Sequence, residues 1–439
     1  MKGESITMLL DIRAASVMLA CAVPVALAPS SAAAKPLAEA LRLEDVLAIA
    51  RDENPEIVAA RARAREAKEM PAQARAWDDP VVSWEAWNTP NNFNVAHAAN
   101  NIFRVAQRFP FPGKRRLAGE SAADDARAAA LGADAVVLDV EAAVKRAFWS
   151  LWQAHQRGAV YERQRVLAER FAKTAEQRYA TGGVPQSDVL RAQVELTHAI
   201  TDVQTASLAI DTARAALNAL LSRPPGDPLG VPEEPRLPSL PPNADGLIET
   251  ALARRPELSA QDATIAGQQH AVSLARKAYL PDFELSVGRF VNFDARDGFG
   301  AMASVTVPIA NKGKYDAAIS QANARVAVAE ADRRRLADAV RRDVEQAWLR
   351  VRTATLRHDL FARTHLPQAE QAIQVTESAY AAGTVDLLAL LDTLRGLEQV
   401  HLDHIDSQAE IQSAWADLER AVGGPLPDVG AVQEVRHHG

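Results

Sequence analysis

The sequence has 439 residues, a formal net charge of -7 and 48% hydrophobic residues, so the chain is long and apolar enough to fill a large folded core. Its basic residues alternate with acidic ones instead of forming one stripe, which argues against a nucleic-acid partner. The sequence contains no nucleophile elbow, phosphate-binding loop, Cys-x-x-Cys or zinc-protease motif. We therefore expect neither enzymatic activity nor a cofactor.

Residues 1–34 have the pattern of a secretory signal peptide. A weakly charged start is followed by an apolar run, and SSAAAK then supplies the small residues that a signal peptidase recognises. The apolar run is too short to span a bilayer, which argues against an anchor. Cys21 is the only cysteine, so cleavage after this segment would leave a chain without thiols. MLAC at residues 18–21 is a poor lipoprotein box, and lipidation of Cys21 stays open as an alternative.

The first half of the remaining sequence predicts two strands set between helices. Residues 43–77 have a helical pattern, Pro80 opens a strand region that extends to residue 88, and a second strand covers residues 102–109. Residues 114–179 contain no proline and carry small apolar residues at steps of three and four, which predicts one long helix. This helix would be about 100 Å long and would need coiled-coil packing against its neighbours.

The second half repeats the first half. Three pairs of residues recur at a constant offset of 201 positions, namely Pro55 and Pro256, Pro80 and Pro281, and Gly182 and Gly383. A proline-rich linker lies between the halves. We therefore divide the chain into a signal peptide (1–34), a first repeat (35–222), a linker (223–242), a second repeat (243–424) and a C-terminal tail (425–439).

The four predicted strands indicate that several chains assemble together. Phe283, Leu285 and Val287 alternate with smaller or polar residues, which is typical of strands with one apolar face. Four strands cannot close a transmembrane β-barrel, because the smallest such barrels have about eight strands. An open edge in lipid would leave backbone groups without hydrogen bonds. Several chains must therefore share one barrel.

Two loop motifs and one strand-end motif resemble a known family. RYATGGVPQSDVLRAQ at residues 178–193 and AYAAGTVDLLALLDTLR at residues 379–395 resemble the tip loops of the TolC family of outer-membrane efflux channels. The resemblance covers nearly the whole chain after the signal peptide. FPFPGKR at residues 109–115 is similar to the heavy-metal branch of that family, the cobalt-zinc-cadmium and copper efflux components.

This resemblance implies a mainly α-helical fold with a small β part, built from two tandem repeats of helix, β-hairpin, long helix and helix. It implies a homotrimer with an α-helical periplasmic tunnel and a shared twelve-stranded barrel in outer-membrane lipid of a Gram-negative bacterium. The partners would be a periplasmic membrane-fusion adaptor and an inner-membrane resistance-nodulation-division pump. The trimer would be a passive duct that exports substrates, with heavy-metal cations expected first.

The family resemblance also assigns roles to the two tip loops. By position it assigns adaptor docking to Gly182, Gly183, Pro185, Ser187, Asp188, Gly383, Thr384 and Leu387. The glycines permit left-handed helix caps, and Ser187 or Asp386 could cap the helix that follows each loop. Drug-efflux relatives close the tip with two rings of aspartate; by the resemblance Asp392 matches the deeper ring of this tunnel gate, and we expect Asp386 to supply the other ring at the mouth. Ala389 occupies one of those two ring positions here, so the gating mechanism stays open.

The strand-end motif predicts a joint between barrel and tunnel. It consists of Phe109, Pro110, Phe111, Pro112, Gly113, Lys114 and Arg115. The prolines would end the strand by withholding donors, and the glycine would let the chain turn into the long helix. We expect Lys114, Arg115 and Arg116 to lie against anionic lipid headgroups, since cations are otherwise disfavoured at the start of a helix.

Two alternatives to this function remain open. A drug-efflux or type I protein-secretion channel would share the same family features. A periplasmic coiled-coil adaptor or scaffold without a barrel would instead bury the alternating strand residues within one chain. His401 and His404 have a spacing that could hold a transition metal, but polar helix faces often carry such pairs, and we predict no metal site.

Overall fold

The computed structural model describes residues 40–89, 91, 95, 98–292 and 296–426. The predicted signal peptide, Cys21 and nearly all of the predicted C-terminal tail lie outside the described residues. The elements of the first repeat are α1 (Leu43–Glu53), α2 (Pro55–Arg75), β2 (Val81–Trp87), β3 (Asn100–Phe109), α3 (Lys114–Ala180) and α4 (Gln186–Leu220). The long helix that the sequence predicted is confirmed as the 67-residue α3.

The second repeat has the same order of elements, except that a π-helical turn divides its long helical segment into two helices. Its elements are α5 (Asp245–Arg254), α6 (Pro256–Lys277), β5 (Asp282–Asn292), β6 (Gly298–Thr306), α7 (Lys312–Leu360), a π-helical turn (Phe361–His365), α8 (Leu366–Ala381) and α9 (Leu387–Val422). The long helix predicted for this repeat is therefore present as α7 and α8, with the π-helical turn between them. Pro367 supplies no backbone N–H, and the π-helical turn lies directly before the helix that contains it.

The prediction of a single helix over residues 43–77 is wrong, because the chain forms two helices there, α1 and α2, which are separated at Asn54. Pro55 is the first residue of α2 and has no N–H to donate, so a new helix starts there. The Asn54 side chain caps that helix by accepting from Glu56 N at 2.9 Å and Ile57 N at 3.4 Å. The second repeat is divided at the matching position, between Arg255 and Pro256.

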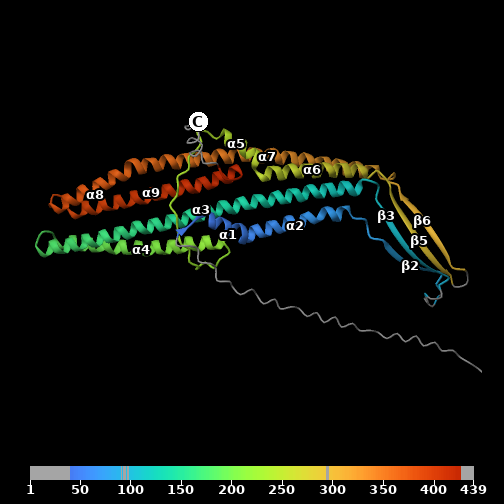
Figure 1. The fold of residues 1–439 in the computed structure, drawn as a ribbon, viewed down its shortest axis with the longest axis horizontal. Helices are drawn as coiled ribbons and strands as arrows, with labels where there is room; N and C mark the ends of the chain where they lie inside the picture. The colour runs from blue at the N-terminus through green and yellow to red at the C-terminus, as the bar shows by residue number, and fades with distance from the viewer. Residues whose placement is uncertain (1–39, 90, 92–94, 96–97, 293–295, 427–439) are drawn as a thin grey trace, which may run out of the picture. The chain divides into compact units, whose positions relative to one another are not determined.

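The four long strands form one antiparallel sheet in the order β2-β3-β5-β6 (Figure 1). Val82, Val105, Val287 and Ala301 form one row across it. The face that holds this row is apolar and exposed, with Leu285 54%, Val287 62% and Val305 49% exposed. The opposite face carries polar residues such as Ser286, which is buried. The sheet therefore has an uncovered apolar face.

The linker contributes a small pairing that the sequence did not predict. β1 (Ala40–Leu41) pairs in parallel with β4 (Val231–Pro232). The linker is also fixed to the second repeat, because Trp348 Nε1 donates to Pro241 O at 3.0 Å. Gln412 Nε2 donates to Arg236 O at 2.8 Å. These contacts hold the linker on one side of α7 and α9.

α3 lies at the centre of the helical packing. It contacts α2 and α4 on one side and α6 and α9 on the other (Figure 1). Its small-residue seam is buried or half-buried at Ala133, Val140 and Val144, as the three-and-four spacing predicted. Phe148, Leu151 and Trp152 form the largest buried cluster with residues of α1, α4 and α9. Among the described residues, no helix combines the length and the apolar character needed to cross a membrane.

Candidate functional site

The two predicted tip loops have the same backbone geometry. Gly182 and Gly383 have φ values of 71° and 76°, which confirms the predicted left-handed caps. In the first loop, Gly183 N donates to Arg178 O at 2.8 Å. In the second loop, Thr384 N donates to Ala379 O at 3.0 Å. The internal repeat therefore extends to the hydrogen bonds that end the two long helical segments.

The fold brings the two loops together. Arg178, at the end of α3, donates from Nη1 to Tyr380 O at 2.9 Å. Its guanidinium also lies 4.9 Å from the centre of the Tyr380 ring. Gly182, Gly183, Pro185, Ser187, Gly383 and Thr384 are exposed, and Asp188 is half-buried. Leu387 is 1% exposed and belongs to the apolar core of the tip, so its assignment as a docking residue is wrong.

The two predicted helix caps differ. Asp386 caps α9, because its Oδ1 accepts from Ala389 N at 2.9 Å. Ser187 does not cap α4, since Pro185 occupies the cap position and the Ser187 hydroxyl faces Asp188 Oδ1 at 3.5 Å. Asp386 and the other predicted gate residue, Asp392, are both exposed. Within the part of the chain that is described, no cation pairs with either carboxylate.

Asp282, the first residue of β5, organises the joint between sheet and helices. Its Oδ1 accepts from Lys114 Nζ at 2.8 Å and from Phe111 N at 2.9 Å. Its Oδ2 accepts from Arg108 Nη2 at 3.0 Å. Gly113 has a φ of 91°, which supports its predicted role as the turn into α3. Sequence reasoning missed Asp282, although its position after Pro281, a repeated proline, was a usable signal.

The three cations at the start of α3 have protein partners. Lys114 is 16% exposed at its side chain and also donates to Leu280 O at 2.9 Å, so its predicted position against lipid headgroups is wrong. Arg115 donates to Arg75 O at 2.8 Å and lies 3.3 Å from the centre of the Trp77 ring. Arg116 pairs with Glu120 at 2.6 Å. Ion pairs and ring contacts therefore offset the unfavourable helix dipole.

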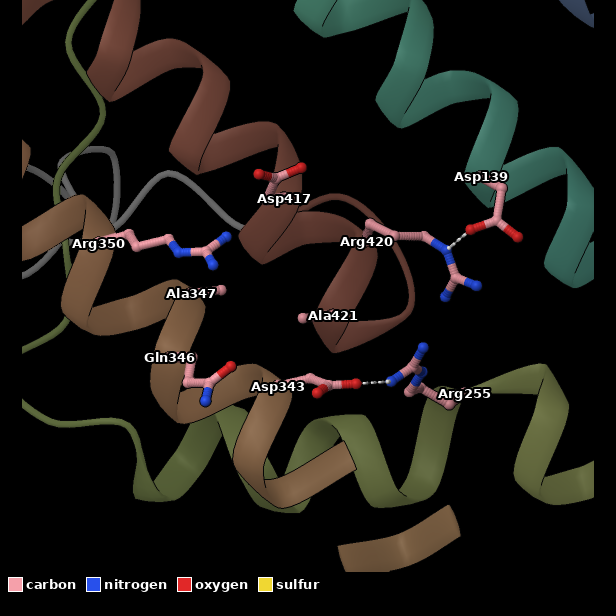
Figure 2. A pocket seen from close by; sticks show the side chains of 9 residues that line it. All are labelled: Asp139, Arg255, Asp343, Gln346, Ala347, Arg350, Asp417, Arg420 and Ala421. Atoms are coloured by element: carbon pink, nitrogen blue, oxygen red, sulfur yellow. Dashed lines mark hydrogen bonds and ion pairs between the residues drawn. The ribbon is translucent and has the colours of Figure 1, made fainter. Parts of the chain in front are cut away.

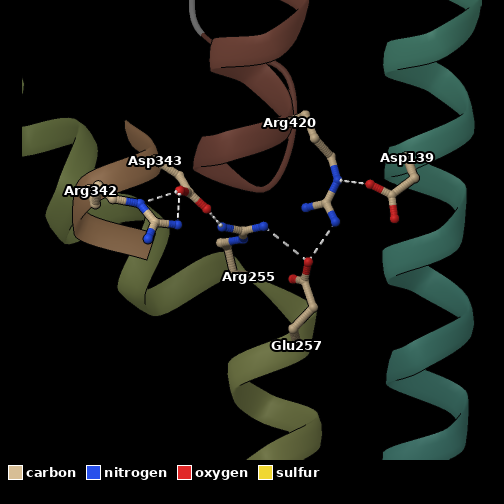
Figure 3. Close-up of polar contacts among 6 residues, drawn as sticks. All are labelled: Asp139, Arg255, Glu257, Arg342, Asp343 and Arg420. Atoms are coloured by element: carbon tan, nitrogen blue, oxygen red, sulfur yellow. Dashed lines mark hydrogen bonds and ion pairs between the residues drawn. The ribbon is translucent and has the colours of Figure 1, made fainter. Parts of the chain in front are cut away.

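A chain of six charges joins the two repeats (Figure 3). Its members, in order, are Arg342, Asp343, Arg255, Glu257, Arg420 and Asp139. Arg420 lies between α3 and α6, with Nε 2.5 Å from Asp139 Oδ1 and Nη2 2.6 Å from Glu257 Oε1. Sequence reasoning gave none of these residues a functional role and expected only local salt bridges at Arg342 and Asp343. A signal for the special position of Arg255 was present in the internal repeat, because Arg255 occupies the position that corresponds to the capping residue Asn54 of the first repeat.

The Glu257 carboxylate is stabilised in its charged form. Burial acts to raise its pKa, but hydrogen bonds from Arg420 and from the backbone, together with the charges of Arg420 and Arg255, outweigh burial. The pKa of Glu257 is therefore lowered from its ordinary value of 4.5.

Of the two histidines of α9, His404 contacts α7. The His404 ring stacks on the His358 ring with centroids 4.9 Å apart. His358 Nδ1 lies 3.2 Å from Ser407 Oγ. Burial lowers the pKa of His358, His401 and His404. Over residues 40–426, leaving out the few positions the structure does not describe, no group of three or more histidine, cysteine or acidic residues is arranged to hold a metal ion.

Comparison with known proteins places this fold in a family. The family described as "Outer membrane efflux protein" matches residues 46–223 and 247–424. The cobalt-zinc-cadmium resistance protein CzcC of Cupriavidus metallidurans is 26% identical over 392 residues, which are 87% of this chain and 90% of that protein. The pyoverdine export outer membrane protein OpmQ of Pseudomonas putida is 30% identical over 198 residues, which are 41% of this chain and 40% of that protein.

A solved structure supports the same fold. A crystal structure of CusC matches with a TM-score of 0.74 and 17% sequence identity, covering 87% of this chain and 92% of that chain. These matches confirm the resemblance inferred from the tip-loop motifs. Because the two matched ranges together cover well over half of the chain and include both hairpins, this chain belongs to the outer membrane efflux protein family.

Proposed function

We propose that this outer membrane efflux protein is the channel of a tripartite resistance-nodulation-division system and acts as a passive homotrimeric duct. The observation that carries the proposal is the exposed apolar face of the four-stranded sheet, which includes Leu285, Val287 and Val305. Such a face suits contact with lipid hydrocarbon. A periplasmic adaptor or scaffold would bury the same residues within one chain, so the exposure argues against that alternative.

The two lateral edges of the chain favour contact with further copies of the same chain, which would close the sheet into a barrel. β2 and β6 are the edge strands of the sheet. On the helical part, exposed apolar residues lie on α4 (Leu190, Val194 and Leu208) and on α7 and α8 (Leu349, Leu356 and Val375). Each set has no partner within the described chain. Contact between the α4 edge of one copy and the α7–α8 edge of the next would cover both and pair the edge strands. Three copies, the number implied by the family resemblance, would give twelve strands.

The tip loops supply the proposed partner contact and gate. Their exposed glycines and Thr384 offer backbone and small side chains to an adaptor, with the pump on the far side of the adaptor. Trimer symmetry would bring three copies each of Asp386 and Asp392 together at the mouth, where mutual repulsion would favour an incoming cation. Neither carboxylate forms an ion pair with a cation of the described residues, and this supports the assignment.

Heavy-metal cations are the proposed cargo. The support is the resemblance of residues 109–115 to the heavy-metal branch and the similarity to a cobalt-zinc-cadmium resistance protein over 87% of this chain. The second candidate is an organic solute, because the chain is also 30% identical over 198 residues to a pyoverdine export protein. Deletion of the gene, followed by growth on zinc, cobalt, cadmium, copper and a drug panel, separates them. Sensitivity confined to organic compounds would contradict the metal proposal.

The duct itself is tested by its location and assembly. We expect the protein in the outer-membrane fraction as a trimer that dissociates on heating, and as a conducting pore in a planar bilayer. Recovery of the chain as a soluble monomer that forms no pore would contradict the proposal.

The gate is tested in single-channel recordings. Asp392→Ala and Asp386→Asn should raise conductance and weaken block by divalent cations, because each removes one ring of charge. Asparagine is chosen at position 386 because it also caps helices and so preserves the start of α9. Asp52→Ala removes an exposed carboxylate from α1 and is the matched control. If all three variants behave as the wild type does, the gate lies elsewhere.

A further inference from the structure

A pocket outside the tip and the joint lies between the two repeats. Its volume is about 340 Å³, and Ala347 and Ala421 form its apolar floor (Figure 2). The charged and polar lining comes from α3, the start of α6, α7 and α9, and consists of Asp139, Arg255, Asp343, Gln346, Arg350, Asp417 and Arg420. The small side chains of the floor leave room between the charged ones.

The carboxylates of this pocket are already neutralised. Asp139 pairs with Arg420 at 2.5 Å. Asp343 pairs with Arg342 at 2.7 Å and lies 3.8 Å from Arg255. The third carboxylate, Asp417, pairs with Arg146, which comes from α3, at 2.5 Å. The acidic part of the lining is therefore engaged by protein cations and is a poor ligand for a further cation.

The lining holds three arginines and three aspartates, and their ion-pair partners Arg146, Arg342 and Glu257 bring the cluster to five arginines and four carboxylates, which leaves one positive charge in excess. Arg350 extends from α7 toward α9, and no carboxylate within the described residues pairs with it (Figure 2). Arg255 is 9% exposed, yet none of the residues that the structure describes accepts a hydrogen bond from its Nε. Nη1 of Arg420 is likewise buried without an acceptor in that part of the chain. Buried donors without acceptors are unfavourable, and a ligand oxygen toward which either guanidinium group turns would relieve them.

The pocket opens away from the linker. Trp348 of α7 contacts the linker. Gln346 and Arg350 each lie two positions from Trp348 along α7, so their side chains leave the helix about 200° away from the Trp348 side chain. Arg350 is exposed on that side. The pocket is therefore accessible to a small solute even though the linker covers the other side of the same helices.

We propose that this pocket binds a small multivalent oxyanion, with one acidic group at Arg350 and another at the end formed by Arg255 and Arg420. Guanidinium groups suit this ligand because they donate in pairs to carboxylate and phosphate oxygens. The ligand class includes tricarboxylates and pyrophosphate. The site does not depend on the duct proposal, since it is complete within one chain.

Isothermal titration of the purified full-length protein with citrate, pyrophosphate and chloride tests the site. We expect saturable binding of citrate or pyrophosphate and none of chloride. Binding of citrate alone would identify the carboxylate class, and binding of pyrophosphate alone the phosphate class. Arg350→Gln should weaken binding by roughly tenfold or more, the loss expected for a charge-assisted hydrogen bond.

Matched variants distinguish this site from general electrostatics. Gln346→Glu adds a negative charge to the lining with almost no change in size, and we expect it to weaken binding as Arg350→Gln does. Arg334→Gln and Gln321→Glu make the same charge changes at exposed positions of α7 outside the pocket and should bind as the wild type does. The proposal is overturned if neither multivalent anion binds, or if the pocket variants and the controls lose affinity equally.

Discussion

The backbone conformation of the tip loops favours glycine over every other residue type at the positions of the tip glycines. Gly182 has a φ of 71°, and a Cβ atom added there would meet nothing within 4 Å. The requirement for glycine is therefore one of backbone conformation and not of space. Gly132, in the middle of α3, also has open space around its Cα, but it has an ordinary helical conformation.

These two glycines should respond to alanine in opposite directions. We expect Gly182→Ala to lower the free energy of unfolding by about 1 kcal/mol, because a left-handed conformation strains a residue with a Cβ. Gly132→Ala should raise it by about 0.5 to 1 kcal/mol, since alanine favours a helix more than glycine does. Chemical denaturation followed by circular dichroism measures both. Equal effects of the two substitutions would refute the interpretation of the tip cap.

At the scale of the elements, the long helical segments of the two repeats differ at one place. α3 is continuous, whereas the second repeat passes through the π-helical turn Phe361–His365. His358 lies three residues before this turn and stacks on His404 of α9. Burial lowers the pKa of His358 and outweighs the opposing effect of the Asp359 charge. The pKa of His404 is lowered by burial and by the charges of His358 and His401.

This stack should make the helix pair sensitive to acid. A histidine whose pKa is lowered in the folded state takes up a proton more readily when unfolded, so stability falls as the pH drops below the ordinary value of 6.5. We expect His358→Gln to reduce the fall in unfolding temperature between pH 8 and pH 5. His198→Gln, at an exposed position of α4, should keep the wild-type fall. An unchanged pH dependence in the His358 variant would rule out this role.

The charge chain between the repeats is a second element-scale feature. Glu257 is the carboxylate that Arg255 and Arg420 share, and both arginines are largely buried. Loss of the negative charge of Glu257 would leave the two largely buried guanidinium groups without a carboxylate that both of them pair with. The exposed pair Arg357 and Glu410 provides the contrast, since both side chains are 53% exposed.

Glu257→Gln should therefore destabilise the fold by about 3 kcal/mol at neutral pH. Glu410→Gln should cost less than about 1 kcal/mol, as exposed ion pairs do. The pKa of Glu257 is lowered, so its contribution is present above pH 4.5 and is lost as the pH falls through its folded-state pKa. Unfolding curves at pH 7 and pH 4 test both statements, and a neutral effect of Glu257→Gln at pH 7 would contradict them.

At the scale of the whole molecule, the uncovered edges are the main feature. Leu208 of α4 is 67% exposed within one chain. We expect Leu208→Glu to leave the chain folded and to weaken assembly, because a charge would be buried between copies. Val166→Glu, on α3, is the control, since α3 already has helices on both sides. Crosslinking followed by gel electrophoresis measures the trimer. Trimers of normal heat stability from Leu208→Glu would place the interface elsewhere.

Most of the fold could be predicted because its signals are local or repeated. The absence of proline over residues 114–179, the spacing of small residues and the glycines after each long helix each fix local backbone geometry. The error over residues 43–77 also had a local cause. Pro55 starts a new helix, although it lies in a sequence with a helical pattern.

The candidate site was less predictable. The tip positions could be placed from motifs, but Leu387 was assigned to docking because a loop motif does not reveal burial. Asp282 and Lys114 are 168 positions apart, and Arg420 and Asp139 are 281 apart. No periodicity links such pairs, so their partners could not be identified before the fold was known.

The sequence by itself determined the two repeats, the long helices, the alternating strands and the glycine caps, since each depends on residues close together in the chain. Tertiary structure decided which charges meet, which apolar face stays uncovered and which residues of the tip are buried. It paired Lys114 with Asp282 in place of the expected lipid headgroups, and it placed Arg115 against Trp77 and Arg116 against Glu120. The physical reason is that ion pairing and burial depend on distances in space, and only the packed helices bring those groups together.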